Sequence, residues 1–442
     1  MRILITNNTL AGRAGSELYV RDLAIELMRR GHHPVAYSTT LGAVAEELRN
    51  ATIPVIDHLG ALGAKPDIIH GHHHLEAVTA MLHFPDVPAI HYCHGWVPWQ
   101  EVPLDSPQIL RYVAVSQLCR ERLIAEAGIA PERVEVMGNF FDERRFAPRP
   151  PLPRKPRRVL AFGNDFSEHK GLAQIREACA RLNLEFDAAG MSVGESEADP
   201  GARLARYDIV FAKGRAAIEG LAVGNAVVLC NSDNLGPLVT RANFKANRDL
   251  NFGMRAIPKP LVANSVVEQL SLYDADEAAA VSQLARENCG LQPAVDRIVA
   301  LYCAVLDEAR SRPAPCIREM ARAAGDYLEH WAPSYKRAVN DPHELQRWRE
   351  RCLAAESILA SLQREHQRLT DRYYEAESEK NAVQERLNHL ESLLEDIRTS
   401  ATWRWSRNVL ESPIVQRVFG RGIKQVAARA RSNGKLHTDR NA

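Results

Sequence analysis

Short apolar runs alternate with amphipathic helical patterns over the first 310 residues of this 442-residue chain, and this alternation constrains the fold more than any other feature. Such alternation is typical of repeated strand–helix–strand units around parallel sheets. The apolar runs predict strands at 2–6, 33–38, 67–71, 89–93, 112–116, 134–138, 158–163, 184–190, 208–212 and 226–230. The expected fold class is therefore α/β, with Rossmann-like domains.

The alternation is broken by residues 146–158, which contain five prolines and five cations. Proline fixes φ and removes a backbone donor, so this stretch is typical of a linker. The chain is also too long for one ordinary core. We therefore expect one Rossmann-like domain over 1–147, a linker over 148–157 and a second domain over 158–310.

Beyond the second domain, we expect a connecting helical segment at 311–340 and a coiled coil at 341–399. Apolar residues recur there at every fourth and then third position from Trp348 to Ile397, and only His366 and Lys380 interrupt this seam. This is the spacing of a coiled coil. A long helix packed on the body of the protein is the alternative.

The last segment, 400–442, is predicted to be a basic amphipathic tail. Between 402 and 431, seven cations and a single acid, Glu411, interleave with tryptophan and aliphatic residues. This composition suits peripheral contact with an anionic membrane, with Pro413 interrupting the helix. A basic tail that docks on the protein, or is disordered, explains the pattern equally well.

Overall composition limits the classes of function. Lys and Arg number 56 against 55 Asp and Glu, which argues against a nucleic-acid-binding protein. The eight cysteines contain no Cys-x-x-Cys pair and the start reads as a strand rather than a secretory leader, which favours a cytoplasmic protein with reduced thiols. No run of about 18 uncharged apolar residues predicts a membrane span.

The first candidate site is a basic turn, Lys213, Gly214 and Arg215, between a predicted strand and helix. Strand ends in parallel sheets face the ligand cleft, and a helix N-terminus attracts anions. Lys213 and Arg215 add full positive charges, so the turn predicts a pyrophosphate site. Glu219, one turn further on, is placed to accept hydrogen bonds from a ribose. An exposed turn with solvated cations is the alternative.

Two other loops have a similar arrangement. Gly163, Asn164 and Lys170 lie where another strand of the second domain ends, and Lys170 is expected to reach the same phosphates. In the first domain, a loop precedes a helix in the same way at Gly12, Gly15 and Ser16. This loop does not match the Gly-x-Gly-x-x-Gly pattern of nicotinamide-binding proteins.

Histidines end two strands of the first domain. His70, His72, His73 and His74 form one group, and His94 precedes a glycine. We expect no metal site, because no carboxylate or cysteine lies at a recognisable ligand spacing. His94 is predicted to contact a substrate, with a hydrogen-bonded core histidine as the alternative. The Asp-x-Asp at 274–276 reads as a helix N-cap and not as a metal site.

Over residues 1–305 the chain resembles the GT-B glycosyltransferases, and within them glycosyltransferase family 4. The resemblance is carried by "AGSELYVRDLAIELMRRGHHP", "DIIHGHHH", "HYCHG", "YVAVSQLCRERL", "VEVMGNFFDERRF", "AFGNDFSEHKGL" and "AIEGLAVGNAVVLCNSDNLGPLV". It places Asn139 and Asp142 in the interdomain region and Glu219 on the donor ribose. Two positions depart from the family pattern: Asn164 stands where an arginine is usual, and Phe211 where an earlier glutamate is usual.

The resemblance implies a metal-independent transferase that uses no cofactor beyond its donor, a nucleotide-diphosphate sugar. Lys170, Lys213 and Arg215 would stabilise the departing diphosphate. The implied acceptor is a glycan or a lipid-linked acceptor, and the architecture of the chain predicts a role in the synthesis of a bacterial surface polysaccharide. The coiled coil predicts a homo-oligomer, and the tail predicts contact with the inner face of the plasma membrane. The alternatives are a non-catalytic GT-B scaffold, and an epimerase or hydrolase in which His94 or Asp165 serves as acid or base.

Overall fold

The computed structural model describes residues 1–96, 99–167, 170–193, 199–313, 315–340, 342–415, 417–418, 421–422 and 424–425, except for the side chains of 338–340, 342–361, 363–364, 397–398 and 401–403. It divides into two compact units, 1–346 and 347–442. Residues 426–442 of the predicted tail lie outside the described residues.

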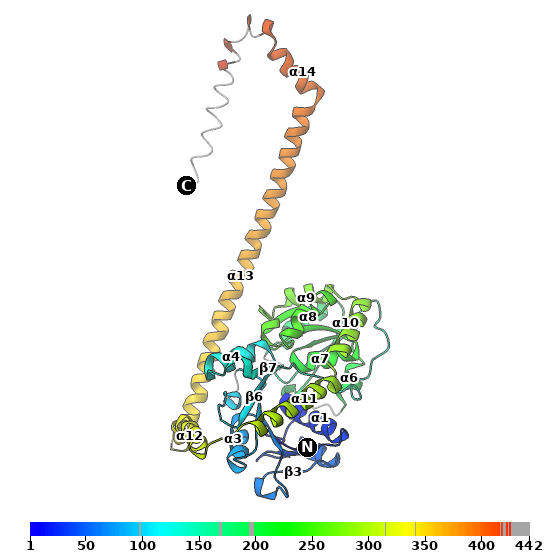
Figure 1. The fold of residues 1–442 in the computed structure, drawn as a ribbon. Coiled ribbons are helices and arrows are strands. Elements are labelled where there is room, and N and C mark those ends of the chain that lie inside the picture. Colours follow the sequence, from blue (N-terminus) through cyan, green and yellow to red (C-terminus); the bar gives the residue numbers. More distant parts are fainter. Residues whose placement is uncertain are drawn as a thin grey trace. The chain divides into compact units, whose positions relative to one another are not determined.

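The first domain is built on a seven-stranded parallel sheet with the strand order β3-β2-β1-β4-β5-β6-β7. Its strands and first helices are coloured blue to cyan in Figure 1. Its strands are β1 (Arg2–Thr6), β2 (His33–Tyr37), β3 (Val55–Ile56), β4 (Ile68–His72), β5 (Ala89–Cys93), β6 (Ile109–Ala114) and β7 (Val134–Val136). Its helices are α1 (Gly15–Arg29), α2 (Ala43–Asn50), α3 (His74–His83) and α4 (Gln117–Ala127). The strand order reverses between β1 and β4, which places the ligand-binding crevice of such a sheet beside their carboxyl ends.

The second domain has a six-stranded sheet with the order β13-β12-β11-β10-β8-β9. Its strands are β8 (Arg158–Phe162), β9 (Glu185–Ala189), β10 (Ile209–Ala212), β11 (Ala226–Cys230), β12 (Asn234–Leu238) and β13 (Lys259–Pro260). Its helices are α5 (Leu172–Arg181), α6 (Pro200–Leu204), α7 (Gly214–Val223), α8 (Arg241–Asp249), α9 (Ala263–Ser271) and α10 (Ala275–Asn288). Asp274 caps α10 by accepting hydrogen bonds from the N–H groups of Asp276 and Glu277, as the sequence predicts. The pair β12 and β13 runs antiparallel at the edge.

Helix α11 (Leu291–Ser311) follows the second domain in sequence but packs on the first. Its buried residues Val295, Ile298 and Tyr302 belong to the same apolar core as β1, β4 and β5. The chain therefore crosses between the two cores twice, first between Phe140 of the first core and Phe141 of the second, and again on its return through α11. The stretch expected to be a linker packs on the second domain, where the N–H of Arg149 donates a hydrogen bond to the carbonyl of Val223 and Leu152 lies against the core.

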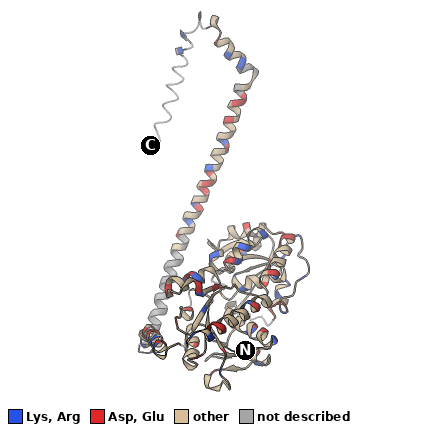
Figure 2. Cartoon of the chain, viewed as in Figure 1, with Lys and Arg blue, Asp and Glu red and all other residues tan. Residues whose placement is uncertain are grey.

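Three helices follow. Helix α12 (Ile317–Asn340) covers the predicted connecting segment, α13 (Pro342–Thr399) is a single helix of 58 residues over the predicted coiled coil, and α14 (Ala401–Leu410) begins the tail. Helix α14 ends before Pro413, as the sequence predicts. Within its described part, α13 carries charges of both signs along its length (Figure 2). In the described part of the chain, no helix is both long enough and apolar enough to cross a bilayer.

Candidate functional site

The two basic loops of the second domain meet because their strands are neighbours. Strands β8 and β10 pair in parallel, with Ala161 opposite Phe211, so both chains leave the sheet at the same edge. There the Lys213 ammonium donates a 2.6 Å hydrogen bond to the Asp165 carboxylate. The two side chains are 32% and 35% exposed, so this pair is open to solvent and to a ligand.

The backbone packs tightly around this edge. Gly171, which precedes α5, has φ +83°, and a Cβ there would lie 2.8 Å from the carbonyl oxygen of Ser232. Gly214 also has a positive φ of +55°, but its N–H donates a 2.7 Å hydrogen bond to the carbonyl of Phe252. The N–H expected to bind an anion at Gly214 is therefore already paired in this structure, so the charged group that this turn offers an anion is the Lys213 ammonium.

The remaining residues of the two loops are distributed as follows. The side chain of Asn164 contacts the turn that follows β9, where its Oδ1 accepts a 3.1 Å hydrogen bond from the N–H of Met191. Lys170 exchanges backbone hydrogen bonds with Ser167, and its side chain is exposed. Phe211, at the position where the family pattern has a glutamate, is fully buried in the apolar core of the second domain.

Arg215 does not lie in an open basic turn, as its sequence context suggests. Its Nε donates a 2.8 Å hydrogen bond to Glu219, and Nη2 donates to Asp22 of α1 in the first domain. The exposed fractions of the three side chains are 8%, 7% and 1%. Arg21 also pairs with Asp22, at 2.7 Å. This buried ion cluster, formed by Arg21, Asp22, Arg215 and Glu219, connects α1 to α7.

The cluster changes what its members can do. Burial alone would lower the pKa of the Arg215 guanidinium, but Asp22 and Glu219 outweigh it and raise that pKa. Burial raises the pKa of the Glu219 carboxyl, and Arg215 offsets part of the change. Arg215 thus stays charged, with its donors committed to carboxylates rather than to a pyrophosphate. Asp22 was not predicted from the sequence. The available signal was its place on the same buried face of α1 as Tyr19 and Glu26, because a carboxylate on a buried helix face is unusual unless it is paired.

The glycine loop of the first domain binds an acid of its own helix. The N–H groups of Gly12 and Ala14 donate hydrogen bonds of 2.9 and 2.7 Å to the two carboxylate oxygens of Glu17, whose exposed fraction is 1%. Gly15 and Ser16 form the first turn of α1. The anion expected at this loop is therefore supplied by Glu17, and Gly12 is not free to bind a phosphate in this structure.

The histidines of the first domain stack between β4 and β5. His72 Nδ1 lies 2.6 Å from His94 Nε2, and the ring centroids are 4.8 Å apart. The backbone N–H of His94 donates a 2.9 Å hydrogen bond to Glu101, which sequence reasoning missed. Nδ1 of His73 accepts a hydrogen bond from the backbone N–H of Asn8, so the ring proton lies on Nε2. That nitrogen is 3.4 Å from a carboxylate oxygen of Glu101. In the part of the chain that the structure describes, no three of these groups are arranged to hold a metal ion.

His94 lies close to the second domain through aromatic contacts. The Tyr19 ring packs edge-on against His94 at 5.1 Å and contacts Phe140 at 4.5 Å, and the Arg215 guanidinium lies 5.8 Å from the Phe140 ring. Burial, opposed by Glu101, lowers the pKa of His94 to about 4, with a smaller contribution from Arg215. At neutral pH His94 is therefore an uncharged hydrogen-bonding group beside the domain junction.

Asn139 also lies at this junction, where its backbone is held by the second domain. Its N–H donates a 2.8 Å hydrogen bond to Asn251, and its carbonyl accepts one of 2.8 Å from Arg248. The sequence placed Asn139 in the interdomain region, and the structure shows that its main chain makes the contact.

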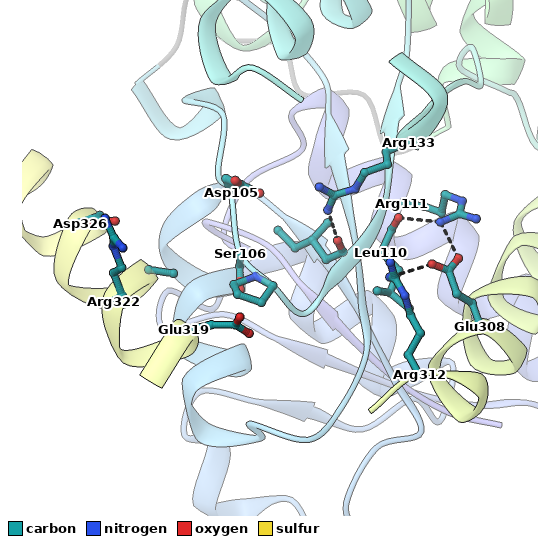
Figure 3. A pocket seen from close by; sticks show the side chains of 13 residues that line it. Asp105, Ser106, Leu110, Arg111, Arg133, Glu308, Arg312, Glu319, Arg322 and Asp326 are labelled. Carbon is teal, nitrogen blue, oxygen red and sulfur yellow. Dashed lines mark hydrogen bonds and ion pairs between the residues drawn. The ribbon is translucent and has the colours of Figure 1, made fainter. Parts of the chain in front are cut away.

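A pocket of about 430 Å³ lies at a different place in the first unit, beside the start of β6 and the helices α11 and α12 (Figure 3). In it, Arg111 and Arg312 both pair with Glu308, at 2.6 and 2.8 Å. Its lining contains arginines and acids together and includes none of the site residues predicted from the sequence. Its charge therefore shows no preference for an anion.

The buried histidines predict an acid-sensitive fold. Burial lowers the pKa of His91 to about 3, against a usual value of 6.5. Between pH 6.5 and 3 this histidine therefore binds a proton in the unfolded chain but not in the folded chain. We expect the free energy of unfolding to fall as the pH drops from about 6.5 towards 3. Above pH 6.5 this residue makes no contribution to the pH dependence. Among the described residues, neither ring nitrogen of His91 has a hydrogen-bond partner.

Replacing His91 with leucine should therefore flatten the dependence of Tm on pH between 7 and 4, measured by thermal unfolding in a pH series. The matched control is His83→Leu, at an exposed position on α3, which should leave the slope unchanged. Equal slopes for the parent and His91→Leu would refute this origin of the acid sensitivity.

Comparison with known proteins supports the same architecture. Residues 13–145 match a family model described as Glycosyltransferase Family 4. The Anabaena protein HepE, solved in complex with UDP, superposes with a TM-score of 0.51 at 16% identity over 69% of this chain and 100% of that chain. This similarity confirms the expected GT-B fold of two Rossmann-like domains. No curated protein matches the sequence.

Two further solved structures are similar. They are a glycosyltransferase from Rickettsia africae (TM-score 0.49, 16% identity, 69% of this chain and 98% of that chain) and a putative UDP-N-acetylglucosamine 2-epimerase from Listeria monocytogenes (TM-score 0.45, 16% identity, 72% and 99%).

Proposed function

We propose that this chain, which has the GT-B fold and matches Glycosyltransferase Family 4 over residues 13–145, transfers a sugar from a nucleotide-diphosphate sugar to a glycan or lipid-linked acceptor. The observation that carries the proposal is the Lys213–Asp165 pair at the shared edge of β8 and β10. A half-exposed ammonium beside a helix N-terminus, at the carboxyl ends of parallel strands, is a suitable anchor for a diphosphate.

The proposed mechanism uses charge and position. As the nucleoside diphosphate departs, negative charge grows on its outer phosphate, and a preorganised cation stabilises that charge. Lys213 would exchange Asp165 for a phosphate oxygen, and the exposed Lys170 would approach from the neighbouring loop. Arg215 would act through position, by holding Glu219 and joining the two domains through Asp22.

The direct test is nucleotide binding followed by turnover. HepE of Anabaena was solved with UDP, so UDP is the first probe and GDP the second. A ligand at 100 times its Kd stabilises a protein by about 2.7 kcal/mol, which a thermal shift detects readily. We expect one of these nucleotides to raise Tm, and its sugar conjugate to be consumed with an acceptor extract. The proposed site is wrong if neither nucleotide changes Tm.

A non-catalytic scaffold is the second candidate, because Phe211 is buried where the family pattern has a glutamate and because Arg215 and Glu219 are occupied by each other. This candidate predicts that UDP or GDP binds while no sugar is transferred or hydrolysed. Turnover of the bound nucleotide sugar would exclude it.

The proposal places the enzyme in the synthesis of a bacterial surface glycan, at the inner face of the membrane. Helix α14 supports this, because Arg404 and Arg407 share it with Trp405, which is 68% exposed, and Ile414 beyond it is 76% exposed. Cations beside exposed aromatic and aliphatic side chains suit an anionic headgroup layer. Co-sedimentation with anionic vesicles, compared with a chain lacking 400–442, tests the contact.

A further inference from the structure

Helix α13 presents a long row of large apolar side chains to solvent. Spacings of four and three residues connect Leu362, Leu369, Tyr373, Val383, Leu387, Leu390 and Leu394, which are 47–66% exposed. Isolated exposed apolar side chains are common, but a row at heptad spacing over more than four heptads, interrupted at the large apolar level by His366, Ala376 and Lys380, is typical of a surface that another helix covers. The spacing places Tyr373, Lys380, Leu387 and Leu394 at heptad position a, and Leu362, Leu369, Val383 and Leu390 at d.

The heptad assignment fixes which charges flank the row. Arg372 and Arg386 fall at position g, and Glu377 and Glu391 at position e, and all four side chains are exposed. In a parallel, in-register pair of helices, a g residue lies beside the e residue five positions further along the partner. Arg372 would then contact Glu377 of the partner subunit, and Arg386 would contact Glu391 of the partner subunit.

Two other g residues in this region, Glu365 and Glu379, meet uncharged groups in the same arrangement. Glu365 would face Thr370 of the partner subunit, and Glu379 would face Gln384 of the partner subunit. No pair of like charges is created at these positions. A second copy of this chain, running parallel and in register, therefore complements the row in both shape and charge.

Antiparallel pairing fits the charges less well. Antiparallel helices bring g beside g and e beside e. Two antiparallel registers cover nearly the whole seam from 348 to 397. By sequence position, one brings Arg372 beside Arg372 of the partner subunit and Glu365 beside Glu379 of the partner subunit. The other pairs Arg372 with Glu379 of the partner subunit and Arg386 with Glu365 of the partner subunit, but it also brings Glu356 beside Glu391 of the partner subunit and Arg349 beside Arg398 of the partner subunit, so its like pairs offset its opposite pairs. Like charges in such positions oppose association.

We propose that α13 forms a parallel, in-register two-stranded coiled coil with a second copy of this chain. In this arrangement Lys380 at an a position faces Lys380 of the partner subunit, and a polar a residue of this kind sets the register and the oligomer state at a cost in stability. A consequence is that the α14 segments of both copies leave the coiled coil at the same end. The proposal does not depend on the proposed transferase activity.

Charge exchange in the full-length protein tests the pairing. The variant R372E/R386E makes all four flanking positions acidic, and E377R/E391R makes them all basic. The dimer dissociation constant of each variant alone should be at least about tenfold higher than that of the parent, because four favourable contacts per dimer become repulsive. An equimolar mixture should restore a dimer that contains one copy of each, measured by analytical ultracentrifugation with one variant fluorescently labelled.

The matched control is R368E/E385R, which makes the same kinds of charge change at heptad positions c and f, outside the contact. It should dissociate like the parent. The proposal is overturned if the parent is monomeric at micromolar concentration, or if the two exchange variants associate with themselves as tightly as the control.

Cross-linking tests the orientation. In a chain carrying Cys303→Ser, Cys316→Ser and Cys352→Ser, the substitution Leu394→Cys places one thiol at an a position near the end of α13. A parallel, in-register pair brings the two copies of that thiol together, so mild oxidation should yield a covalent dimer. A dimer that forms in solution but does not cross-link would refute the parallel arrangement.

Discussion

Replacing Arg215 with alanine should lower the free energy of unfolding by about 3–5 kcal/mol, because it leaves two buried carboxylates without their shared cation. Asp22 is 1% exposed and Glu219 7% exposed, so neither can recover its lost hydrogen bonds from water. Arg21 still contacts Asp22, whereas Glu219 loses its i,i+4 partner. Thermal and urea unfolding of Arg215→Ala and the parent measure the difference.

A second ion pair provides the control for Arg215→Ala. Arg255 and Glu121 also join the two domains, and both side chains are 42% exposed. Exposed pairs contribute about 0–1 kcal/mol, so Arg255→Ala should be close to the parent. If Arg215→Ala is as mild as Arg255→Ala, the buried ion cluster does not hold the domains together. The triple variant Asp22→Asn, Arg215→Ala, Glu219→Gln should recover part of the loss, because it removes the unpaired charges along with the cation.

Replacing Lys213 with alanine should reduce kcat by about 10²–10³-fold, the effect of removing one preorganised group from a developing negative charge. The substitution should leave stability nearly unchanged, since Lys213 and Asp165 are 32% and 35% exposed and Asp165 remains hydrated. Steady-state transfer with the nucleotide sugar identified by thermal shift measures kcat and KM separately.

The control for Lys213→Ala is Lys245→Ala on α8, where the lysine is 88% exposed and pairs with Asp249. It should transfer sugar like the parent. A kcat for Lys213→Ala within about threefold of the parent would remove Lys213 from the proposed mechanism. Loss of nucleotide binding without loss of fold would instead assign Lys213 to donor binding in the ground state.

Much of the fold could be predicted from local patterns. Apolar runs of four to six residues locate strands such as β1, β5 and β11. Helix α4 shows why the ends of helices can also be predicted from the sequence: Ser116 caps its start, and Gly128 ends it in the left-handed conformation. These features depend on residues close in sequence, whose preferences act before any tertiary contact forms.

The candidate site was predicted less completely, because the role of each group depends on which partner it meets in the folded chain. The sequence identifies Gly12 as an anion-binding position, but Glu17, only five residues on, takes its N–H. It identifies Arg215 as a phosphate ligand, but Asp22, 193 residues earlier, takes that guanidinium. A charged side chain in a loop looks the same in sequence whether its counter-ion is a ligand or another residue.

The sequence by itself determined the two α/β domains, the long heptad helix and the identity of the charged groups at the strand ends, since all of these follow from spacing and composition within short segments. Only the tertiary structure decided which of those groups meet. The order of β8 and β10 in the sheet brings Lys213 to Asp165, the contact between α1 and α7 buries Arg215 with Asp22 and Glu219, and the return of α11 adds Tyr302 to the first core. The physical reason is that burial and ion pairing are set by long-range packing, which local sequence preference does not encode.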